Sequence, residues 1–320
     1  MSTATVIGFD MGATSTKTGV VRDGVILQKG KVIQTRQDGD TGRLIEAFVS
    51  EILHLKSLYP EVQAVGFGVP GIINPVHGVV VILTNVKGWH DIPLRAVIGE
   101  KTGLVTNLEN DAKAMAYGEW KYGAGQTAPN VVCVTLGTAV GGALILNRRL
   151  YRGATWVAGE IGQTSIDYRG VEFVYGNNGA LEAYVGHRKI AARAKEIYAE
   201  AGITISDEQS YPENLTKAAD NGDEIAERVW ADIGLKIGVG LTNVIWLVNP
   251  DRIVIGGGVA NAGKRLFNYI RHTIQTRCEK TFWEKLEVVP ATLGNDAGII
   301  GAATLALESE FLPSSSASPR

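Results

Sequence analysis

Cysteine and long apolar runs are scarce in this chain of 320 residues. It has two cysteines, Cys133 in an apolar run and Cys278 on an expected helix, and such sparing use is typical of a reducing cytosol. We find no apolar run close to the ~18–20 residues that a membrane helix requires. A strand is expected from about Thr5, which leaves no space for a signal peptide. These scarcities predict a cytoplasmic protein that does not enter a membrane.

Basic charge is not in excess either. Lys and Arg number 31 against 33 for Asp and Glu, so the formal net charge is −2, and the pI is near 6.2. A nucleic-acid surface needs a concentrated basic face, whereas the basic residues here are scattered, so we expect no nucleic-acid partner. The five histidines are dispersed as well and predict no cluster of metal ligands.

What is present is ample material for globular cores, with 45% hydrophobic and 20% charged residues. The length exceeds one ordinary core and predicts two domains. Strand-like and helix-like patterns alternate, which is typical of an α/β fold. The expected strands cover residues 6–10, 18–21, 25–33, 64–68, 79–83, 105–108, 131–136, 143–146 and 252–255. The expected helices cover residues 44–55, 111–117, 190–201, 225–248, 264–278 and 298–307.

We place the domain division between residues 114 and 124. This gives a small N-terminal α/β domain over residues 1–118 and a larger C-terminal α/β domain over 119–297. The last helix, about 298–308, is a candidate to pack back onto the first domain. The tail 309–320 is rich in serine and has nothing to bury, so we expect it to be disordered.

Two stretches, 6–21 and 131–146, repeat one plan: an apolar strand, a turn of small residues and a second strand. Small residues in a turn leave backbone N–H groups open to anions, phosphate above all. Two such turns in corresponding places predict a duplicated fold that binds a polyphosphate from both sides. The polar and glycine residues of the two turns are Asp10, Gly12, Thr14, Lys17, Gly137 and Thr138.

Asp10 and the later glycine turn each allow two interpretations. Asp10 can hold Mg²⁺ directly or through water, with Thr14 donating to phosphate, or both can belong to an ordinary hairpin; the matching second turn favours phosphate binding. The run Gly256-Gly257-Gly258 follows a strand and precedes a helix. It serves either helix packing or a close backbone approach to adenine or ribose, and its position after the second turn supports a nucleotide site.

Further polar residues lie where strands end. Asn110 and Asp111 begin a helix, and their spacing alone favours a helix cap. The alternative is that Asp111 accepts a proton from an alcohol while Asn110 binds a neighbouring hydroxyl. Glu160 and Glu182, near glycines, are either exposed glutamates or acceptors for sugar hydroxyls. The turn that ends at Gly71 either stiffens a loop or approaches a ligand.

Taken together, these motifs resemble the ROK family of repressors, open reading frames and sugar kinases. The resemblance runs in order from Gly8 to about Leu307 and is most specific over residues 136–153, 158–162 and 181–184. It implies a duplicated actin/hexokinase-like (ribonuclease H-like) α/β fold with an active-site cleft between two domains. It implies an ATP-dependent hexose kinase, with glucose as the acceptor and an N-acylhexosamine, mannose or fructose as alternatives. Polyphosphate is the alternative donor.

The resemblance also implies residue roles, with Asp111 as the general base. The implied sugar contacts are Gly71, Asn85, Asn110, Glu160, Gln163 and Glu182. The implied contacts of ATP and Mg²⁺ are Asp10, Gly12, Thr14, Lys17, Gly137, Thr138, Gly257 and Gly258. A dimer or tetramer is expected. The alternative class is a sugar-sensing repressor, whose DNA-binding segment precedes the first strand, and a strand from about Thr5 leaves no space for one. A non-catalytic sugar-binding protein is disfavoured by the presence of Asp10, Thr14 and Asp111 together.

The chain departs from the family where the family binds structural zinc. The family commonly has a histidine after Glu-Ile-Gly and three cysteines downstream. This chain has other residues at all four positions, so we expect no zinc site of that type. Loop 167–179 must be held otherwise, and burial of two of its aromatic residues is our expectation. The histidine also contacts the sugar in the family, so its replacement leaves the choice of sugar open. The four residues are Gln163, Phe173, Tyr175 and Ala180.

Overall fold

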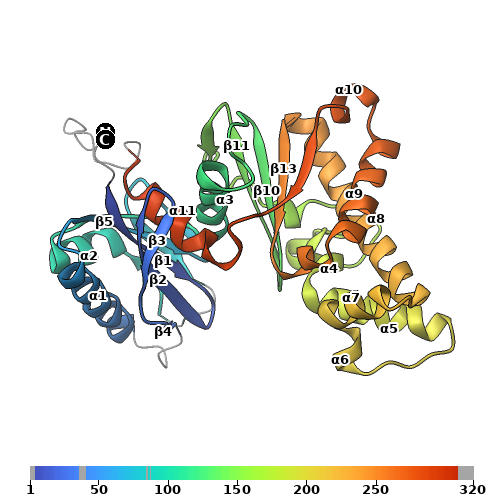
Figure 1. Ribbon diagram of the computed structural model, residues 1–320, viewed down its shortest axis with the longest axis horizontal. Helices are drawn as coiled ribbons and strands as arrows, with labels where there is room; N and C mark the ends of the chain where they lie inside the picture. Colours follow the sequence, from blue (N-terminus) through green and yellow to red (C-terminus); the bar gives the residue numbers. More distant parts are fainter. Residues whose placement is uncertain (1–3, 36–40, 84–85, 87, 309–320) are drawn as a thin grey trace. The chain divides into compact units, whose positions relative to one another are not determined.

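The computed structural model describes residues 4–35, 41–83, 86 and 88–308. The predictions for Asn85 and for the tail 309–320 lie outside the described residues. The chain forms two compact units (Figure 1), which we describe separately. Unit 1 comprises Met1–Gln126, Arg152–Ala158 and Asn295–Arg320, and unit 2 comprises Thr127–Tyr151 and Gly159–Gly294.

A mixed sheet forms the centre of unit 1, with the strand order β3-β2-β1-β5-β9. β1 is antiparallel to β2 and parallel to β5, which is parallel to β9. The carboxyl ends of β1, β5 and β9 therefore lie at one edge of the sheet. The strands are β1 (Thr5–Met11), β2 (Ser15–Arg22), β3 (Val25–Lys29), β5 (Val62–Val69) and β9 (Val105–Asn110), with β4 (Ile33–Gln34) paired to β2. A separate small sheet contains β6 (Ile72–Asn74), β7 (Val79–Ile82) and β8 (His90–Ile92).

Helices cover this sheet and bury their apolar faces on it. The apolar stripe predicted for residues 44–55 faces the core from α1 (Thr41–Leu58), where Phe48 packs edge-on against Phe9 with ring centroids 5.4 Å apart. α11 (Ala297–Leu305), coloured red in Figure 1, packs on β1 and on α3 (Asp111–Tyr122). Glycine allows this close packing, because a Cβ on Gly66 would lie 1.8 Å from the carbonyl oxygen of Ala302. α2 is Leu94–Thr102.

Unit 2 repeats the plan of unit 1, because its sheet has the strand order β12-β11-β10-β13-β14 with the same strand directions. An antiparallel hairpin again leads into two parallel strands. This repetition is what the two similar hairpin sequences predict. The strands are β10 (Val131–Leu136), β11 (Val140–Leu146), β12 (Arg149–Tyr151), β13 (Arg252–Gly256) and β14 (Glu287–Pro290).

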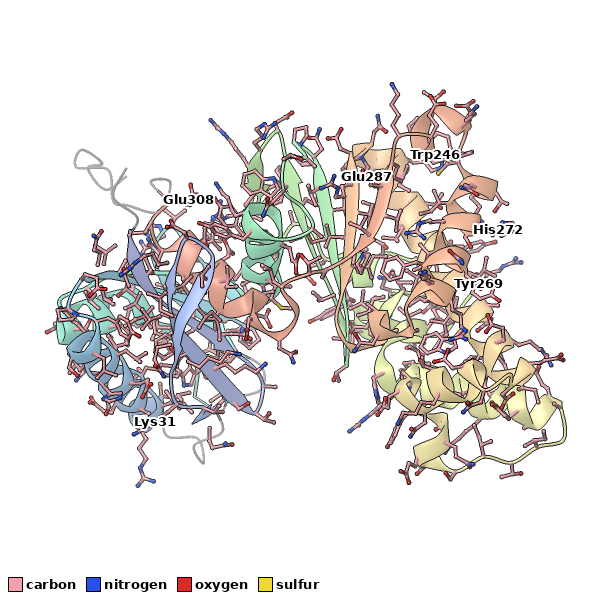
Figure 2. All side chains as sticks on the ribbon, in the orientation of Figure 1. Lys31, Trp246, Tyr269, His272, Glu287 and Glu308 are labelled. Atoms are coloured by element: carbon pink, nitrogen blue, oxygen red, sulfur yellow. The ribbon has the colours of Figure 1, made fainter. Side chains whose placement is uncertain are left out.

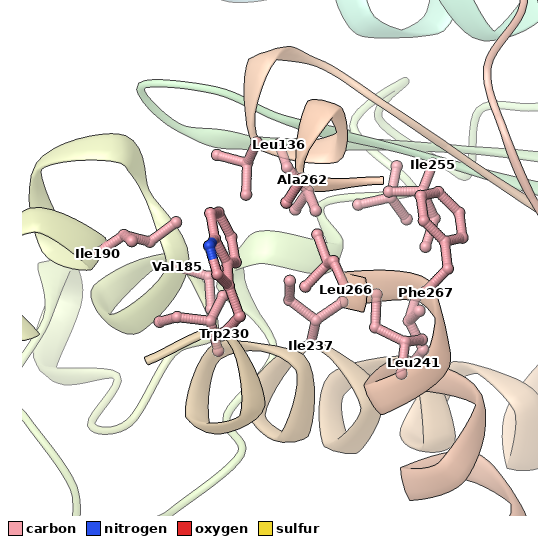
Figure 3. Packing of buried hydrophobic residues seen from close by; sticks show 14 of the residues in the cluster. Leu136, Val185, Ile190, Trp230, Ile237, Leu241, Ile255, Ala262, Leu266 and Phe267 are labelled. Carbon is pink, nitrogen blue, oxygen red and sulfur yellow. The ribbon is translucent and has the colours of Figure 1, made fainter. Parts of the chain in front are cut away.

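The core of unit 2 is built on α8 (Glu224–Val248) and α9 (Lys264–Arg277). Figure 3 shows Trp230 extending from α8 toward Leu136, with Val185 and Ile190 on one side. Among the described residues α8 alone is long and apolar enough to cross a membrane, with a mean hydropathy of 1.4. It is an exception to the expectation that no segment of the chain is apolar over such a length. A core helix passes the same test, and Trp230, Ile233, Ile237 and Leu241 of α8 are fully buried.

The other helices of unit 2 are mostly short. Polar side chains project outward from both units, as His272 of α9 and Lys31 of unit 1 illustrate (Figure 2). The remaining helices are α4 (Glu182–Val185), α5 (His187–Glu200), α6 (Asp207–Ser210), α7 (Pro212–Asp220) and α10 (Lys280–Trp283). Single turns of 3-10 helix are η1 (Ile161–Gln163), η2 (Val174–Gly176), η3 (Gly258–Ala262) and η4 (Gly294–Asp296).

Some predicted elements differ from the observed ones. The strand expected over 25–33 is wrong as one element, because β3 ends at Lys29 and β4 begins only at Ile33. Between them the N–H of Gly30 bonds to the carbonyl of Thr18, and the chain turns toward α1. α2, α7 and β14 were missed. Each is short, with nine residues in α2 and in α7 and four in β14, and buries at most three side chains, so it offers few positions from which a period can be recognised.

Candidate active site

Two carboxylates come together at the strand-end edge of unit 1. Asp10 lies near the end of β1, and Asp111 follows directly after β9 as the first residue of α3. Gly68 of β5 lies between these strands, and a Cβ on it would be 3.5 Å from the Cα of Asp111. The charge of Asp10 reaches Asp111, since it contributes to raising the pKa of the Asp111 carboxyl.

Asp111 has the protonation behaviour expected of a general base near neutral pH. Burial raises its pKa from 3.8 to about 6, and the charge of Asp10 adds to this. The N–H of Ala112, which donates to Oδ1 over 2.8 Å, and the charge of Lys113 act in the opposite direction. A base whose pKa lies slightly below the working pH is deprotonated and still basic enough to take a proton.

Asn110 caps α3, as its spacing predicts. Its Oδ1 accepts from the N–H of Lys113 over 3.2 Å, and its Nδ2 donates to the carbonyl of Gly71 over 3.2 Å. Gly71 has a φ of +100°, and a Cβ there would lie 2.2 Å from the carbonyl oxygen of Ile82. The structure thus brings Gly71, Asn110 and Asp111 to one edge of unit 1.

Behind this edge lies a buried ion pair that sequence reasoning missed. Nε of Arg152 donates to Oε2 of Glu109 over 2.6 Å, and Oε1 of Glu109 accepts from the N–H of Asn110 over 2.9 Å. The side chains are 14% and 1% exposed. Glu109 therefore fixes the backbone directly before Asp111. The only signal in the sequence was an acidic residue in a strand end, with no indication of its partner.

The first hairpin turn positions Asp10. The turn is closed by the N–H of Gly12 donating to the carbonyl of Ser15 over 3.0 Å, and Thr14 and Lys17 are exposed. Lys17 lies opposite Asp10 in the strand pair. Burial raises the pKa of the Asp10 carboxyl, and the charge of Lys17 opposes this.

Asp10 can supply one carboxylate ligand to a Mg²⁺ ion. Mg²⁺ is usually held by one or two carboxylates together with phosphate oxygens and water. Asp10 is buried enough for its pKa to rise, so a nearby cation would stabilise its charged form. Within the described part of the chain no group of three or more His, Cys, Asp or Glu side chains could hold a metal ion. Phosphate and water would have to supply the other ligands.

The second turn, residues 137–140 of unit 2, is fixed by the start of α4 and α5. The carbonyl of Gly137 accepts from the N–H of His187 over 2.8 Å. A Cβ on Gly186 would lie 2.7 Å from the carbonyl oxygen of Thr138, whose own side chain is exposed. Oε2 of Glu182 accepts from the N–H of Val140 over 2.8 Å. Glu182, which the sequence assigns to the sugar, thus contacts the turn that the sequence assigns to phosphate.

The glycine run after β13 divides into two roles. Gly257 has a φ of +85°, and a Cβ on it would lie 2.3 Å from the carbonyl oxygen of Leu136, so this glycine serves packing against the end of β10. Gly258 instead borders a hollow of about 430 Å³. The walls of the hollow include Pro212, Trp230, Val259 and Ala262, and its polar lining includes His187, Glu213 and Lys217. Its size and largely apolar walls fit a planar base.

The segment that contains Glu160 and Gln163 packs against β11, beside the second turn. A Cβ on Gly162 would be 2.3 Å from the carbonyl oxygen of Val140. Glu160 is exposed, and Gln163 is half-buried with its main-chain carbonyl accepting from Nδ2 of Asn177. Unit 2 therefore brings Glu160, Gln163 and Glu182 to the start of β11.

Loop 167–179 is not held by burial of both aromatic residues, so that expectation is wrong. Tyr175 is 103% exposed, while Phe173 is half-buried. Backbone bonds close the loop instead: the N–H of Gly179 donates to the carbonyl of Val171 over 2.7 Å, and its carbonyl accepts from Ile166 over 2.8 Å. The hydroxyl of Tyr184 accepts from the N–H of Val171 over 3.0 Å. These hydrogen bonds hold the loop in place without the burial of an aromatic ring.

Comparison with known proteins relates most of the chain to glucokinases and to xylose repressors. The family model described as ROK family matches residues 6–309. The glucokinase of Halalkalibacterium halodurans is 33% identical over 97% of this chain and 97% of its own. The xylose repressor of Caldicellulosiruptor bescii is 27% identical over 77% of this chain and 63% of its own. The structure of a ROK family glucokinase from Streptomyces griseus with glucose and AMPPNP has a TM-score of 0.77, with 29% identity over 94% of this chain and 99% of that one.

Proposed function

The chain belongs to the ROK family, and from this we propose that it is an ATP-dependent kinase that converts glucose to glucose 6-phosphate. Its fold is the actin/hexokinase-like α/β fold of that family, so the predicted fold class is confirmed. The observation that carries the proposal is Asp111, a half-buried carboxylate directly after β9 whose pKa is raised by desolvation to about 6. Similarity to glucokinases over nearly the full length of both chains supports it.

In the proposed reaction Asp111 is the general base. The oxygen of the sugar 6-hydroxyl attacks the γ-phosphorus of ATP while its proton passes to the carboxylate of Asp111. The new bond joins that oxygen to phosphorus, and the bond from the γ-phosphorus to the bridging oxygen breaks, so ADP leaves with the electron pair. General-base assistance contributes about 10²–10⁴-fold, and most of the remaining effect in phosphoryl transfer comes from positioning and charge neutralisation.

The proposed contacts of the donor are the residues of the two hairpin turns. Gly12, Thr14 and Lys17 would contact phosphate from unit 1, and Gly137 and Thr138 from unit 2. Their turns present backbone N–H groups and an exposed hydroxyl or ammonium group. Mg²⁺, when bound, supplies positive charge to the phosphates, and Asp10 would hold it directly or through water. The base of the nucleotide would occupy the hollow bordered by Gly258, while Gly257 supports the turn.

The acceptor site would be made of carboxylate and amide groups, which bind sugar hydroxyls as acceptors and donors. Asn110 and Gly71 would contribute from unit 1, and Glu160, Gln163 and Glu182 from unit 2. Asn85, outside the described residues, completes the proposed set. Gln163 keeps both a donor and an acceptor where the family commonly has histidine, so we propose mannose, fructose and N-acylhexosamines as alternative acceptors, and polyphosphate as an alternative donor.

A sugar-sensing role without catalysis is the second candidate function. The similarity to xylose repressors favours it, although the chain spans 63% of that repressor's length against 97% for the glucokinase. We also propose a cytoplasmic location, with which the two free, buried cysteines agree, and a homo-oligomer.

The deciding experiment is a coupled assay of ADP release from MgATP with glucose, mannose, fructose, N-acetylglucosamine and N-acetylmannosamine. We expect glucose to give the highest kcat/KM and Asp111→Asn to abolish most of the activity. A parallel assay replaces ATP with polyphosphate and measures sugar phosphate. Sugar binding by calorimetry without ADP release from any sugar would establish the sensing role instead.

A further inference from the structure

The contact between Glu182 and the second turn joins two parts of the proposed site in unit 2. Val140 is the first residue of β11 and closes the turn that begins at Gly137. Its N–H donates to Oε2 of Glu182 over 2.8 Å, across 42 positions of sequence. A side chain assigned to the acceptor thus holds the backbone of a turn assigned to the donor.

Glu182 is rigidly supported for this contact. It begins α4, and its neighbours Leu181 and Val185 are fully buried in the core of unit 2. Directly after α4, the N–H of His187 donates to the carbonyl of Gly137, so the same piece of chain holds both ends of the turn. A displacement of Glu182 therefore has to move the turn with it.

The second carboxylate oxygen of Glu182 remains available for a ligand. A carboxylate accepts about four hydrogen bonds through its two oxygens. In the described residues Oε2 bonds to Val140, and no partner of Oε1 is observed. Glu182 is half-buried, so its carboxylate has limited access to water. One oxygen serves the turn, and the other can accept a sugar hydroxyl.

We infer that Glu182 couples the two substrates: a sugar hydroxyl bound at Oε1 fixes the carboxylate that orders the phosphate turn through Oε2, so the sugar tightens nucleotide binding. This inference rests on the proposed function. By thermodynamic linkage the nucleotide must tighten sugar binding by the same factor. The physical basis is entropic: the first ligand restricts the side chain and the turn, and the second ligand then meets a turn already ordered.

The test measures binding of MgAMPPNP by calorimetry, without glucose and with saturating glucose. For the wild type we expect glucose to tighten nucleotide binding by about tenfold, within the range typical of coupled sites. For Glu182→Ala we expect the nucleotide to bind several-fold more weakly without glucose, and glucose to change its affinity less than about twofold. Glu182→Gln keeps an acceptor for Val140 and a donor for the sugar, so it should retain most of the coupling.

Glu160→Ala is the matched control. Glu160 is assigned to the sugar as Glu182 is, but its side chain is exposed, whereas Glu182 is half-buried and accepts from the turn. Glu160→Ala should weaken glucose binding, leave nucleotide binding without glucose at the wild-type value, and keep the tightening once glucose is saturating. Melting curves of all variants establish that each is folded.

The binding results distinguish a failure of the coupling role of Glu182 from a failure of the proposed kinase function. If wild-type protein binds glucose and MgAMPPNP independently, or if Glu182→Ala keeps the full tightening, the coupling role of Glu182 is wrong while the kinase proposal stands. If Glu160→Ala loses the coupling as Glu182→Ala does, the effect belongs to sugar contacts in general, and the inference is again overturned. If no sugar of the panel binds or stimulates ADP release, the proposed function itself fails.

Discussion

Gly298 lies directly against the carboxylate of Asp10: a Cβ on Gly298 would be 2.4 Å from Cγ and 2.5 Å from Oδ1 of Asp10. Gly298 belongs to the first turn of α11. The partial positive charge of the N–H groups at a helix start favours a carboxylate there. The glycine therefore determines how closely Asp10 can approach that helix, and so where a metal-binding carboxylate would lie.

Gly298→Ala should displace the Asp10 carboxylate. The atoms that the new Cβ would meet are those of the Asp10 carboxylate at the end of its side chain, so either this carboxylate rotates away or α11 shifts. We expect kcat to fall by about tenfold or more, as for other small displacements of positioning groups, with a higher requirement for Mg²⁺. Steady-state kinetics with ATP and glucose over a series of Mg²⁺ concentrations measures both effects.

Gly99→Ala is the control for this substitution. Gly99 lies within α2 of the same unit, and a Cβ there would meet only the carbonyl oxygen of Leu104 at 3.6 Å, an ordinary contact. Alanine should leave the kinetics unchanged and add up to about 1 kcal/mol of stability through helix propensity. Wild-type kinetics and Mg²⁺ dependence in Gly298→Ala would show that the position of Asp10 is unimportant.

Asp111→Asn should lower kcat by about 10²–10⁴-fold, because it removes the proposed base. The change in shape is small, so glucose affinity measured by calorimetry should remain within a few-fold. In the wild type the deprotonated form is the active one, so the rate should rise with pH through the pKa of about 6 and then level off. A rate that is constant from pH 5 to 7 would contradict the assignment.

The same substitution should raise stability at high pH. The folded-state pKa of Asp111 lies above its ordinary value of 3.8, so the unfolded chain releases this proton at lower pH than the folded protein. The wild type therefore loses stability relative to Asp111→Asn as pH rises from about 4 to 6, and the difference is constant above that range. A shift from 3.8 to about 6 corresponds to at most about 3 kcal/mol. Thermal melts at pH 4 and pH 8 test this, and equal differences at the two pH values would refute it.

The sequence was sufficient for features that depend on local pattern. The repeated hairpins carry strong period-two alternation and small-residue turns, and they correctly indicated two similar sheets. The Asn110 cap follows from local spacing too. Contacts between distant segments were not predictable: Glu109 meets Arg152 across 43 positions, and Glu182 meets Val140 across 42. A single sequence has no periodicity that reports such pairs. The expected burial of Tyr175 failed because backbone bonds, which any sequence can make, close that loop.

Removing one partner of the Glu109–Arg152 pair should destabilise the protein strongly. Arg152→Met leaves the carboxylate of Glu109 buried without its counter-charge, which typically costs about 3–5 kcal/mol. The double variant Glu109→Gln with Arg152→Met contains neither charge and should regain most of that stability. We expect its kcat to stay low, since an amide oxygen holds the N–H of Asn110 less strongly than a carboxylate. Urea unfolding and steady-state kinetics give the two quantities.

The control for this pair lies on the surface of the same unit. Arg22 and Glu61 are also 2.6 Å apart, but their side chains are 37% and 48% exposed. Arg22→Met should change stability by less than about 1 kcal/mol. Recovery of full kcat together with stability in the double variant would mean that the buried pair serves the fold alone and does not position Asp111.

Tyr184→Phe should loosen loop 167–179 without unfolding unit 2. The substitution removes only the hydroxyl that accepts from the N–H of Val171, and the ring can keep its contact with Lys236, whose Nζ lies 5.8 Å from the ring centroid. The loss of one hydrogen bond should lower stability by about 1 kcal/mol. It should speed hydrogen exchange at the amide of Val171. Tyr175→Ala is the control, because that ring is fully exposed and its loss should leave exchange unchanged. If instead Tyr175→Ala loosens the loop and Tyr184→Phe does not, side-chain contacts hold the loop, and the hydrogen-bond explanation is wrong.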